Sequence, residues 1–149
     1  MPNRKRLYLA APLFNASEKA FNLELKQLFS EKFNVFLPQE DGHLLVNLLL
    51  KGHDLEEAVR KVFQADVSAV KRSEVVFAVL DGRTIDEGVA FELGLAYALN
   101  IPCYGFQTDV RRLWPAGNNP MIEEACQEIF TNLDEVKRWL KKVKLNPPN

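Results

Sequence analysis

Residues 74–80, EVVFAVL, are the stretch of sequence that decides the fold. After the opening glutamate, their unbroken run of β-favouring apolar residues is typical of a central parallel strand that helices cover on both faces. The polar loop that begins at Asp81 and a helix-forming segment, residues 86–99, follow directly. A strand that leads through a short loop into a helix is half of a βαβ unit, so this stretch predicts an α/β fold with a parallel sheet.

The rest of the chain alternates between strand and helix signals in the same way. Short apolar runs predict strands at residues 7–11, 35–37, 101–106 and 128–130. Apolar residues at helical spacing predict helices at residues 18–32 with Ser17 as N-cap, 54–71, and 133–143 with Asn132 as N-cap, plus a short helix after Pro120. Residues 39–42 predict a polar turn, and residues 44–50 a lid or a short helix. We therefore expect residues 1–149 to form a single-domain, flavodoxin-like three-layer sandwich around a five-stranded parallel sheet, with residues 1–6 and 145–149 frayed.

Composition argues against several classes of protein. The chain has 149 residues, 47% of them hydrophobic, and its 19 basic and 20 acidic side chains leave a net charge of -1. This balance predicts no general attraction to nucleic acid or to an anionic membrane. Two cysteines are too few for a disulfide framework, no apolar run approaches the ~20 residues of a membrane span, and the start lacks a signal-peptide core. We expect a cytoplasmic protein.

One carboxylate in the helix at residues 86–99 is out of place. After its first turn this helix is apolar on all sides except at Glu92, and such a helix is usually buried. Burying an ionised carboxylate without partners is costly, and Gly88, one turn earlier on the same face, leaves a slot beside it. Glu92 therefore either meets a substrate in this slot or pairs with a lysine or arginine. In the second case Gly88 and Gly94 serve close packing of the helix on the sheet.

The other candidate residues also have more than one interpretation. Asp86 begins the same helix, where an aspartate is expected as the N-cap. Asp66 lies nearer the apolar side of the preceding helix, and is either functional or a salt-bridged surface residue. A tyrosine in a buried strand, such as Tyr8, is more often a core residue than a catalytic one. His43 and His53 lack metal-ligand spacing with cysteine, and the chain has no G-x-G-x-x-G motif or P-loop, so we expect no metal and no nucleotide cofactor.

Four spaced features of the sequence belong together. Residues 8–14 read YLAAPLF, and Asp66 precedes by seven residues the segment SEVVFAV that begins at Ser73. Residues 81–94 read DGRTIDEGVAFELG, which is the most specific feature, and residues 119–121 read NPM. In this order they resemble the nucleoside 2-deoxyribosyltransferase family over most of the chain. They are similar to that family's patterns Y-x-A-x-P-x-F, D-G-x-x-x-D-x-G-x-x-x-E-[LIV]-G and N-x-M.

The resemblance implies an enzyme that moves 2-deoxyribose between purine or pyrimidine bases, through a covalent sugar–enzyme intermediate, with retention, ping-pong kinetics and some hydrolysis. Its partners would be deoxynucleosides and free nucleobases, and it would need no cofactor. The implied catalytic residues are Glu92 as the nucleophile at C1′, Tyr8 as the group that orients it, and Asp66 as the acid near the departing base. The implied substrate-binding residues are Asp86 on a deoxyribose hydroxyl, Phe14 on the base ring, Gln39 on the polar edge of the base, Gly88, Asn119 and Met121.

The resemblance also implies a homo-oligomer. Asn119 would reach the 5′ end of the sugar in a neighbouring subunit's site, and the loop from Trp114 to Met121 would lie at an interface. A site closed by a neighbour would slow the entry of water and favour transfer over hydrolysis.

Two other functions stay open. A related group of enzymes hydrolyses deoxynucleoside 5′-monophosphates and typically has serine at the position of Asp86. A phosphate carries about -1.5 to -2 charges, so Asp86 would repel it and favours nucleosides. The second alternative is a non-catalytic nucleotide-binding module. The chain departs from the family pattern at two places. Glu74 stands where the family often has aspartate, at a position to which we assign no catalytic role. Residues 44–53 match no family pattern, so the sequence predicts no preference between purines and pyrimidines.

Overall fold

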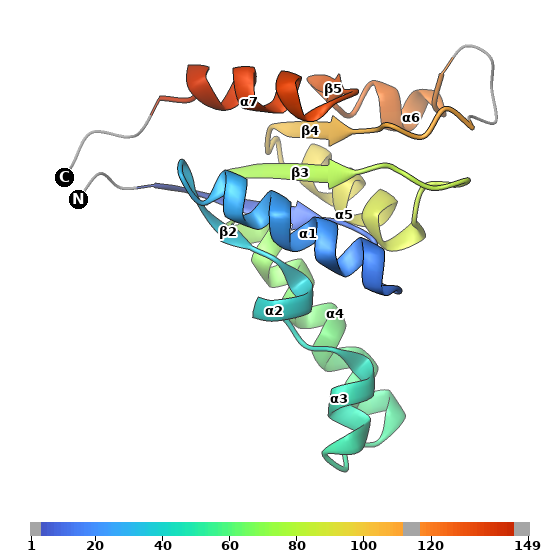
Figure 1. Ribbon diagram of the computed structural model, residues 1–149. Helices are drawn as coiled ribbons and strands as arrows, with labels where there is room; N and C mark the ends of the chain where they lie inside the picture. The colour runs from blue at the N-terminus through green and yellow to red at the C-terminus, as the bar shows by residue number, and fades with distance from the viewer. Residues whose placement is uncertain (1–3, 112–116, 145–149) are drawn as a thin grey trace.

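A five-stranded sheet forms the centre of the molecule in the computed structural model, which describes residues 4–111 and 117–144 (Figure 1). Its strands are all parallel and lie in the order β2-β1-β3-β4-β5. They are β1 (Lys5–Ala10), β2 (Phe33–Phe36), β3 (Val75–Val79), β4 (Cys103–Phe106) and β5 (Glu128–Phe130). All five residues of β3 are buried. The predicted five-stranded parallel sheet with a covered central strand is therefore confirmed.

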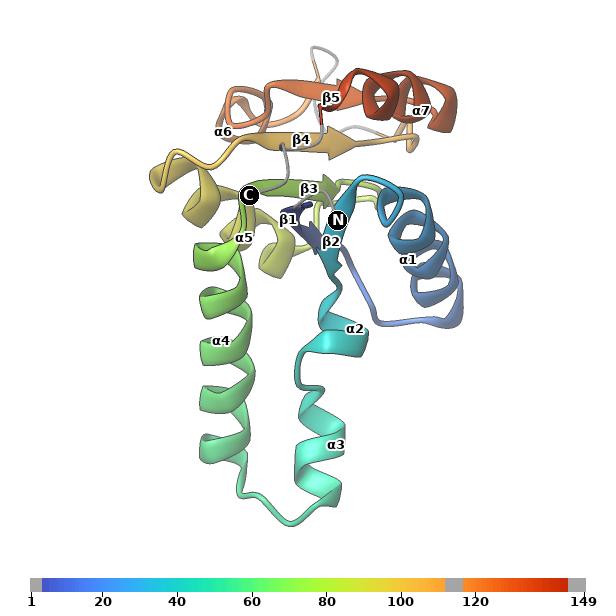
Figure 2. The ribbon, with the colours of Figure 1, turned by 90° about the vertical axis from the view of Figure 1, so that its left-hand side faces the viewer.

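Helices cover both faces of this sheet (Figures 1 and 2). One face carries α1 (Ala16–Phe29) and α7 (Leu133–Lys142), and the other carries α4 (Leu55–Arg72), α5 (Glu87–Ala98) and the short α6 (Pro120–Glu123). Successive side chains of β1 alternate between the two layers, because Leu7 and Leu9 face α1 and α7, whereas Tyr8 and Ala10 face α4 and α5. The predicted flavodoxin-like three-layer sandwich is confirmed.

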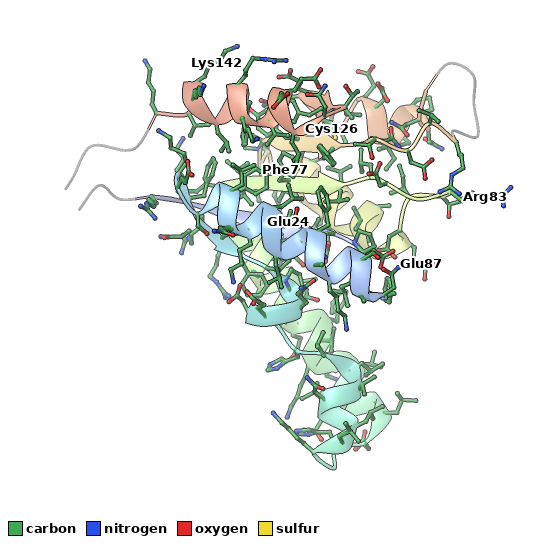
Figure 3. The ribbon with its side chains drawn as sticks, viewed as in Figure 1. Glu24, Phe77, Arg83, Glu87, Cys126 and Lys142 are labelled. Carbon is green, nitrogen blue, oxygen red and sulfur yellow. The ribbon has the colours of Figure 1, made fainter. Side chains whose placement is uncertain are left out.

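Small residues line the side of the sheet that faces α5. Ala10 and Ala78 lie there, and a Cβ on Gly105 would come within 2.8 Å of Cδ1 of Leu80. The opposite side is aromatic, with the ring of Phe77 at the centre of the layer under α1 and α7 (Figure 3). The small side chains allow α5 to lie close to β1 and β3, which brings the helix within reach of side chains from the sheet.

Capping residues define where the main helices begin. Asp86 and Asn132 cap α5 and α7, as predicted, by accepting a hydrogen bond from the backbone N–H three residues on. The prediction of Ser17 as the cap of α1 is wrong. The helix begins before Ser17, and Oδ1 of Asn15 accepts a 2.9 Å hydrogen bond from the N–H of Glu18. Ser17 therefore lies within the first turn.

The segment between β2 and α4 is helical where the sequence left it undecided. α2 (Pro38–Asp41) stands in place of the predicted polar turn, and α3 (Leu45–Leu50) agrees with the short-helix alternative. Together α3 and α4 form an arm, residues 45–72, whose outer part extends away from the sheet while the last turns of α4 pack against it (Figure 2). Several large apolar side chains of the arm are exposed, among them Leu50, Leu55 and Phe63. Gathered apolar surface of this kind is typical of an interaction site.

The prediction that α5 is buried on all sides is wrong. One face of the helix packs on the sheet, but Phe91 and Tyr97 are 53% and 62% exposed. The sheet covers only one side of a helix, and α4 and α6 flank α5 without covering its outer face. A Cβ on Gly94 would have no heavy atom within 4 Å. Close packing on the sheet is therefore not the reason for a glycine at this position.

The ends of the chain follow the prediction only in part. Lys5 and Arg6 belong to β1, so the predicted fraying does not reach them. Residues 1–3 and 145–149 lie outside the described residues, as does Trp114. No helix within residues 4–111 and 117–144 is both long enough and apolar enough to cross a membrane.

Candidate active site

A tyrosine from the central sheet holds the carboxylate of Glu92. Tyr8 lies in β1 and is fully buried, with its ring stacked on that of Phe36 at a centroid distance of 5.5 Å. Its hydroxyl donates a 2.5 Å hydrogen bond to Oε1 of Glu92 on α5. Because a strand and a helix fix the two residues, one carboxylate oxygen is tied to the sheet and Oε2 is left for another partner.

Asp66 on α4 is a second carboxylate in this region. Its Oδ1 is buried and has no hydrogen-bond partner among the described residues. The backbone at Gly42 passes over this oxygen, since a Cβ there would lie 3.0 Å from Oδ1 of Asp66 and 2.8 Å from the carbonyl oxygen of Pro38. An unpartnered buried carboxylate oxygen is costly unless the group is protonated or meets a ligand.

Burial dominates the electrostatics of the site. It raises the pKa of Glu92 to about 8, against the lowering effect of the Tyr8 hydrogen bond and with smaller increases from the charges of Asp66 and Asp86. Burial also raises the pKa of Asp66 to about 6. The pKa of Tyr8 is raised well above its usual range, first by burial and then by the negative charges of Glu92 and Asp66. Tyr8 is therefore a permanent hydrogen-bond donor at physiological pH.

No cation neutralises these carboxylates within residues 4–111 and 117–144. The ion pairs there all involve other acidic residues. The alternative in which Glu92 pairs with a lysine or arginine is thus not supported. No three His, Cys, Asp or Glu side chains of the described chain are grouped so that they could hold a metal ion. Two carboxyl groups with pKa values on either side of neutrality can divide the roles of nucleophile and acid between them.

A cavity of about 290 Å³ opens beside both carboxylates. Glu92, Asp66, Asp86, Gly88 and Phe14 are among the residues that line it. A Cβ on Gly88 would lie 3.1 Å from Oδ1 of Asp86, so the glycine keeps this space open, as the predicted slot requires. Phe14 is 75% exposed at the mouth of the cavity, where its ring is available to a ligand.

A second cavity of about 600 Å³ lies between α4 and α5 and also reaches Glu92 and Asp66. Most of its lining is apolar, and the rings of Phe63 and Phe91 stand 5.9 Å apart on its wall. The two carboxyl groups therefore line both cavities, and the smaller one also has Asp86 and His43 on its wall.

Asp86 caps α5 with one carboxylate oxygen and keeps the other available for a ligand. Its Oδ1 accepts a 3.0 Å hydrogen bond from the N–H of Val89 at the start of α5. Its Oδ2 has no hydrogen bond among the described residues, so it can accept one from a hydroxyl group in the smaller cavity. The N-cap and the ligand-binding interpretations of Asp86 are thus compatible.

Three predicted site residues do not meet Glu92 within one chain. Oε1 of Gln39 accepts a 2.9 Å hydrogen bond from Asn22, and its Nε2 donates to the carbonyl oxygen of Lys19, so its amide is turned toward α1. Asn119 and Met121 line a separate cavity of about 770 Å³ between α5 and α6. The α5 residues on the wall of that cavity lie on the other side of the helix from Glu92.

Sequence reasoning missed His43 as a site residue. This histidine follows α2 and lines the smaller cavity together with Asp66 and Glu92. One signal could have found it, because His43 comes directly after the polar segment at the carboxyl end of β2, where ligands bind in open α/β sheets. The smaller cavity thus has His43 on its wall, whereas the amide of Gln39 is turned away toward α1.

The fold and these carboxylates define a class of protein: a three-layer α/β protein with two half-buried acidic side chains on the adjacent helices α4 and α5 and an aspartate at the start of α5. A family model described as nucleoside 2-deoxyribosyltransferase matches residues 7–136. The chain therefore belongs to the nucleoside 2-deoxyribosyltransferase family, whose members are glycosyltransferases or glycosidases that act on small molecules. No curated protein matches the chain.

Solved structures share the fold over nearly the whole chain. A conserved protein from Enterococcus faecalis has a TM-score of 0.75 at 24% identity, covering 94% of this chain and 99% of its own. A 2-deoxyribosyltransferase from Bacillus psychrosaccharolyticus has a TM-score of 0.73 at 23% identity, covering 97% and 99%. A CMP N-glycosidase from Clostridium botulinum has a TM-score of 0.56 at 17% identity, covering 92% and 99%. At these identities the likeness concerns the fold.

Proposed function

We propose that the protein is a nucleoside 2-deoxyribosyltransferase that moves 2-deoxyribose between nucleobases. The observation that carries the proposal is the hydrogen bond from Tyr8 to Glu92, with the unpartnered carboxyl group of Asp66 on the same cavity. Retaining transfer at an anomeric carbon needs a nucleophilic carboxylate and an acid on the leaving-group side. Glu92 and Asp66 supply these two groups.

In the first step Oε2 of Glu92 forms a bond to C1′ while the bond from C1′ to the base nitrogen breaks. The electron pair of the broken bond goes to the base, which takes the proton held by Asp66. In the second step an acceptor base attacks C1′, expels Glu92 and returns a proton to Asp66. Two inversions give net retention, and separate entry of the two bases gives ping-pong kinetics. Water in place of the acceptor base gives hydrolysis.

The protonation of the pair has a consequence for this mechanism. Between pH 6 and 8 the two carboxyl groups share about one proton, which favours Glu92 because its pKa is about 8 and that of Asp66 about 6. The reaction needs this proton on Asp66. A bound nucleoside favours that arrangement, because it places a basic nitrogen near Asp66 and an anomeric centre that becomes positive near Glu92. We expect turnover to follow a bell-shaped pH profile with limbs near these two values.

The smaller cavity supports a nucleoside rather than a nucleoside monophosphate as the substrate. Among the residues that the structure describes, no lysine or arginine lines this cavity. The oxygen Oδ2 of Asp86 would repel a phosphate while accepting a hydrogen bond from a 5′-hydroxyl. Arg83, in the loop before Asp86, is exposed and extends away from the molecule (Figure 3). We expect Asp86→Ser to raise activity on the monophosphate relative to the nucleoside, and a wild-type preference for the monophosphate would contradict the proposed substrate.

We also propose a homo-oligomer in which Asn119 completes the site of a neighbouring copy. Within one chain Asn119 lies across α5 from Glu92, so it would need a second copy to reach a sugar. The outer face of α5 supports this arrangement, because Phe91 and Tyr97 are exposed and Gly94 has open space around it. A helical glycine costs about 1 kcal/mol relative to alanine, and close approach of another subunit would explain it.

Mixing two impaired variants tests this shared site. Glu92→Ala and Asn119→Ala proteins would each turn over slowly, and hybrids of the two contain one site with both residues intact. Activity should therefore rise after the variants are mixed under conditions that let subunits exchange. Activity that stays at the sum of the two separate variants would count against a site built from two copies.

Intact mass spectrometry tests the reaction class directly. After mixing with a 2′-deoxynucleoside, the protein should carry one deoxyribosyl group attached to Glu92. A free acceptor base should then yield a new nucleoside, whereas a hydrolase would release the sugar with or without that base. A protein that gains no mass and keeps its function as Glu92→Ala would instead fit the non-catalytic binding module.

We place this activity in the cytoplasm, within one domain of residues 1–149. Cys103 is buried and Cys126 is half-buried, and both are free thiols. Free thiols are typical of a reducing compartment.

A further inference from the structure

The loop that leads from β4 to Asn119 is closed by a pair of amide side chains. Gln107 directly follows β4 and is only 5% exposed. Its Nε2 donates a 2.9 Å hydrogen bond to Oδ1 of Asn118, and Nδ2 of Asn118 donates a 2.8 Å hydrogen bond back to Oε1 of Gln107. We call this reciprocal pair the amide clasp. It ties together two residues that are eleven positions apart in the chain.

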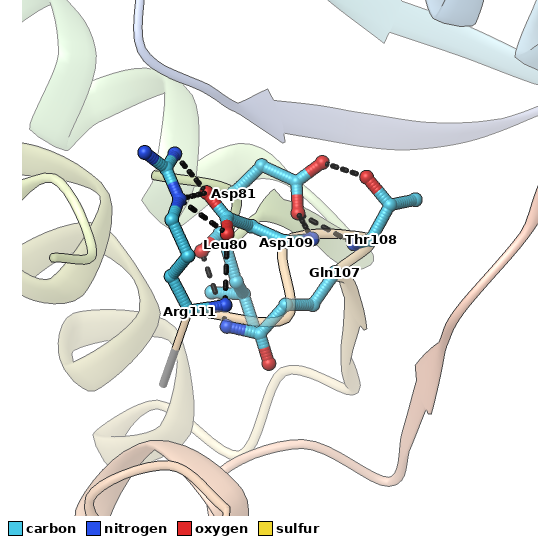
Figure 4. Close-up of polar contacts among 6 residues, drawn as sticks. All are labelled: Leu80, Asp81, Gln107, Thr108, Asp109 and Arg111. Carbon is cyan, nitrogen blue, oxygen red and sulfur yellow. Dashed lines mark hydrogen bonds and ion pairs between the residues drawn. The ribbon is translucent and has the colours of Figure 1, made fainter. Parts of the chain in front are cut away.

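Both ends of the clasp are anchored to the rest of the fold. Nε2 of Gln107 also donates to the carbonyl oxygen of Leu80, at the end of β3, at 3.3 Å (Figure 4). Nδ2 of Asn118 also donates a 3.0 Å hydrogen bond to Oε2 of Glu123 in α6. The clasp therefore joins the sheet on one side to α6 on the other.

Asp81 fixes the first part of the same loop. Its carboxylate accepts hydrogen bonds from the N–H of Thr108 at 2.5 Å, the hydroxyl of Thr108 at 2.6 Å and the N–H of Asp109 at 2.7 Å (Figure 4). Because these donors belong to the loop after β4, Asp81 holds that loop against the end of β3. Thr108 and Asp109, which directly follow Gln107, are therefore fixed against the sheet.

Asn119 follows the clasp immediately and has one amide group left for a ligand. Its Oδ1 accepts a 2.9 Å hydrogen bond from the N–H of Met121 and so caps α6. Its Nδ2 has no hydrogen-bond partner within the described parts of the chain. The clasp and the cap together determine where this donor points.

We infer that Gln107 and Asn118 are positioning residues that aim the amide of Asn119 at the sugar in a neighbouring subunit's site. This inference rests on the proposed transferase function and on the proposed role of Asn119. Hydrogen bonds in a reciprocal amide pair are directional, whereas apolar contacts would tolerate sliding. A displacement of about 1 Å at a substrate-positioning group can reduce rates by about 100-fold. The directional hydrogen bonds of the clasp would prevent such a displacement of Asn119.

The test compares a 2′-deoxynucleoside with its 2′,5′-dideoxy analogue that carries the same base. The ratio of their kcat/KM values measures discrimination for the 5′-hydroxyl. Each hydrogen bond to this hydroxyl, one from Asn119 and one to Asp86, should contribute about tenfold. Asn119→Ala should therefore lower the discrimination about tenfold, to the share that Asp86 supplies. Asn118→Ala should lower it at least about threefold, with the kcat/KM of the dideoxy analogue within about twofold of wild type. The double variant, with both Asn118→Ala and Asn119→Ala, should show no further loss of discrimination beyond that of Asn119→Ala alone, because both changes act on one contact.

A second variant and a control separate positioning from folding. Asn118→Asp keeps the acceptor for Gln107 but replaces the donor by a carboxylate oxygen that faces Oε2 of Glu123, so its discrimination should fall at least as far as that of Asn118→Ala. Gln127→Ala removes another amide bonded to a side chain, the 2.9 Å partner of Tyr104, and should leave discrimination unchanged. Size-exclusion chromatography and thermal unfolding should show the wild-type assembly and fold.

Two results would overturn the inference. Equal losses on both substrates in Asn118→Ala would mean that the clasp has only a structural role. Unchanged discrimination in Asn118→Ala, while Asn119→Ala lowers it, would leave the proposed role of Asn119 standing and refute positioning by the clasp. Unchanged discrimination in Asn119→Ala itself would instead refute the proposed role on which the inference rests.

Discussion

Two neighbouring regions of the molecule treat their acidic residues in opposite ways. In the cavity between α4 and α5, Glu92 and Asp66 are desolvated, lie near each other's charge and have no cationic partner among the described residues. At the ends of β3 and β4, Asp81 accepts three hydrogen bonds. Beside it, the hydrogen-bonded guanidinium of Arg111 holds the pKa of Asp109 below its usual range. The first region leaves a carboxylate oxygen of Asp66 without a partner and gives Glu92 one hydrogen bond, whereas the second pairs its carboxylates with several donors.

This difference separates what the fold needs from what the chemistry needs. Folding alone favours paired or hydrogen-bonded carboxylates, because a buried charge without partners destabilises the native state. Unsatisfied groups persist where function requires them, at some cost in stability. Removal of a polar group should therefore reduce mainly turnover in the first region and mainly stability in the second, and the following variants test that contrast.

The largest effect is expected from Glu92→Gln. Loss of the proposed nucleophile should reduce turnover by at least ~10⁴-fold, while the fold survives. The pKa of Glu92 in the folded protein, about 8, lies above its ordinary value of 4.5, so the folded state resists ionisation. Wild-type stability should then fall as pH rises from about 4.5 to 8, and the variant should lose less. Urea unfolding at pH 5 and pH 8 measures this, and an identical pH dependence in the two proteins would contradict it.

Asp66→Asn should have the next largest effect. Removal of the general acid typically reduces rates by about 10²–10⁴-fold. The loss should be smaller for a nucleoside whose base departs readily without a proton. Measurement of kcat/KM for two nucleosides that differ in the basicity of the base would show this dependence, and an equal loss for both would argue against Asp66 as the acid.

Tyr8→Phe should reduce turnover by about tenfold and also shift its pH dependence. The hydroxyl of Tyr8 lowers the pKa of Glu92, so its removal should raise that pKa above 8. In the proposed mechanism the limb near pH 8 belongs to Glu92 and the limb near pH 6 to Asp66, so the alkaline limb of the pH–rate profile should move to higher pH. The plateau rate should fall, because a smaller share of the singly protonated enzyme has Glu92 ionised. Tyr104→Phe removes a hydroxyl bonded to Gln127 instead and serves as the control, with an unshifted profile. A limb that stays in place in Tyr8→Phe would show that Tyr8 does not tune Glu92.

The smallest effect is expected from Thr108→Val in the satisfied region. This nearly isosteric change removes the 2.6 Å hydrogen bond to Asp81. The free energy of unfolding should fall by about 1 kcal/mol, with turnover within about twofold of wild type. Increased stability on urea unfolding would erase the contrast between the two regions.

Local signals made the most reliable predictions about this chain. The apolar run of β3 and the aspartate at the start of α5 are decided by neighbouring residues, so strand, helix and cap were all predictable. Glu92 attracted attention for a physical reason as well, as one carboxylate in an apolar helix. Its contact with Tyr8 joins residues 84 positions apart, and only the family pattern made that pairing predictable.

Long-range packing explains what could not be predicted. The amide of Gln39 turns toward Asn22 and Lys19 because α2 packs against α1, and no local pattern carries that information. The exposure of Phe91 and Tyr97 depends on how far the sheet and flanking helices reach over α5. The amide clasp depends on two loop residues that meet only in the folded chain.

The place of Tyr8 on the first strand has a consequence for protein synthesis. Tyr8 leaves the ribosome early, but its partner is made 84 residues later, and β1 must still pair with β3 before the two can meet. A nascent chain that stops short of α5 therefore lacks Glu92 altogether. The hydrogen bond on which the proposed site depends can form only after residues 8–92 have all been synthesised.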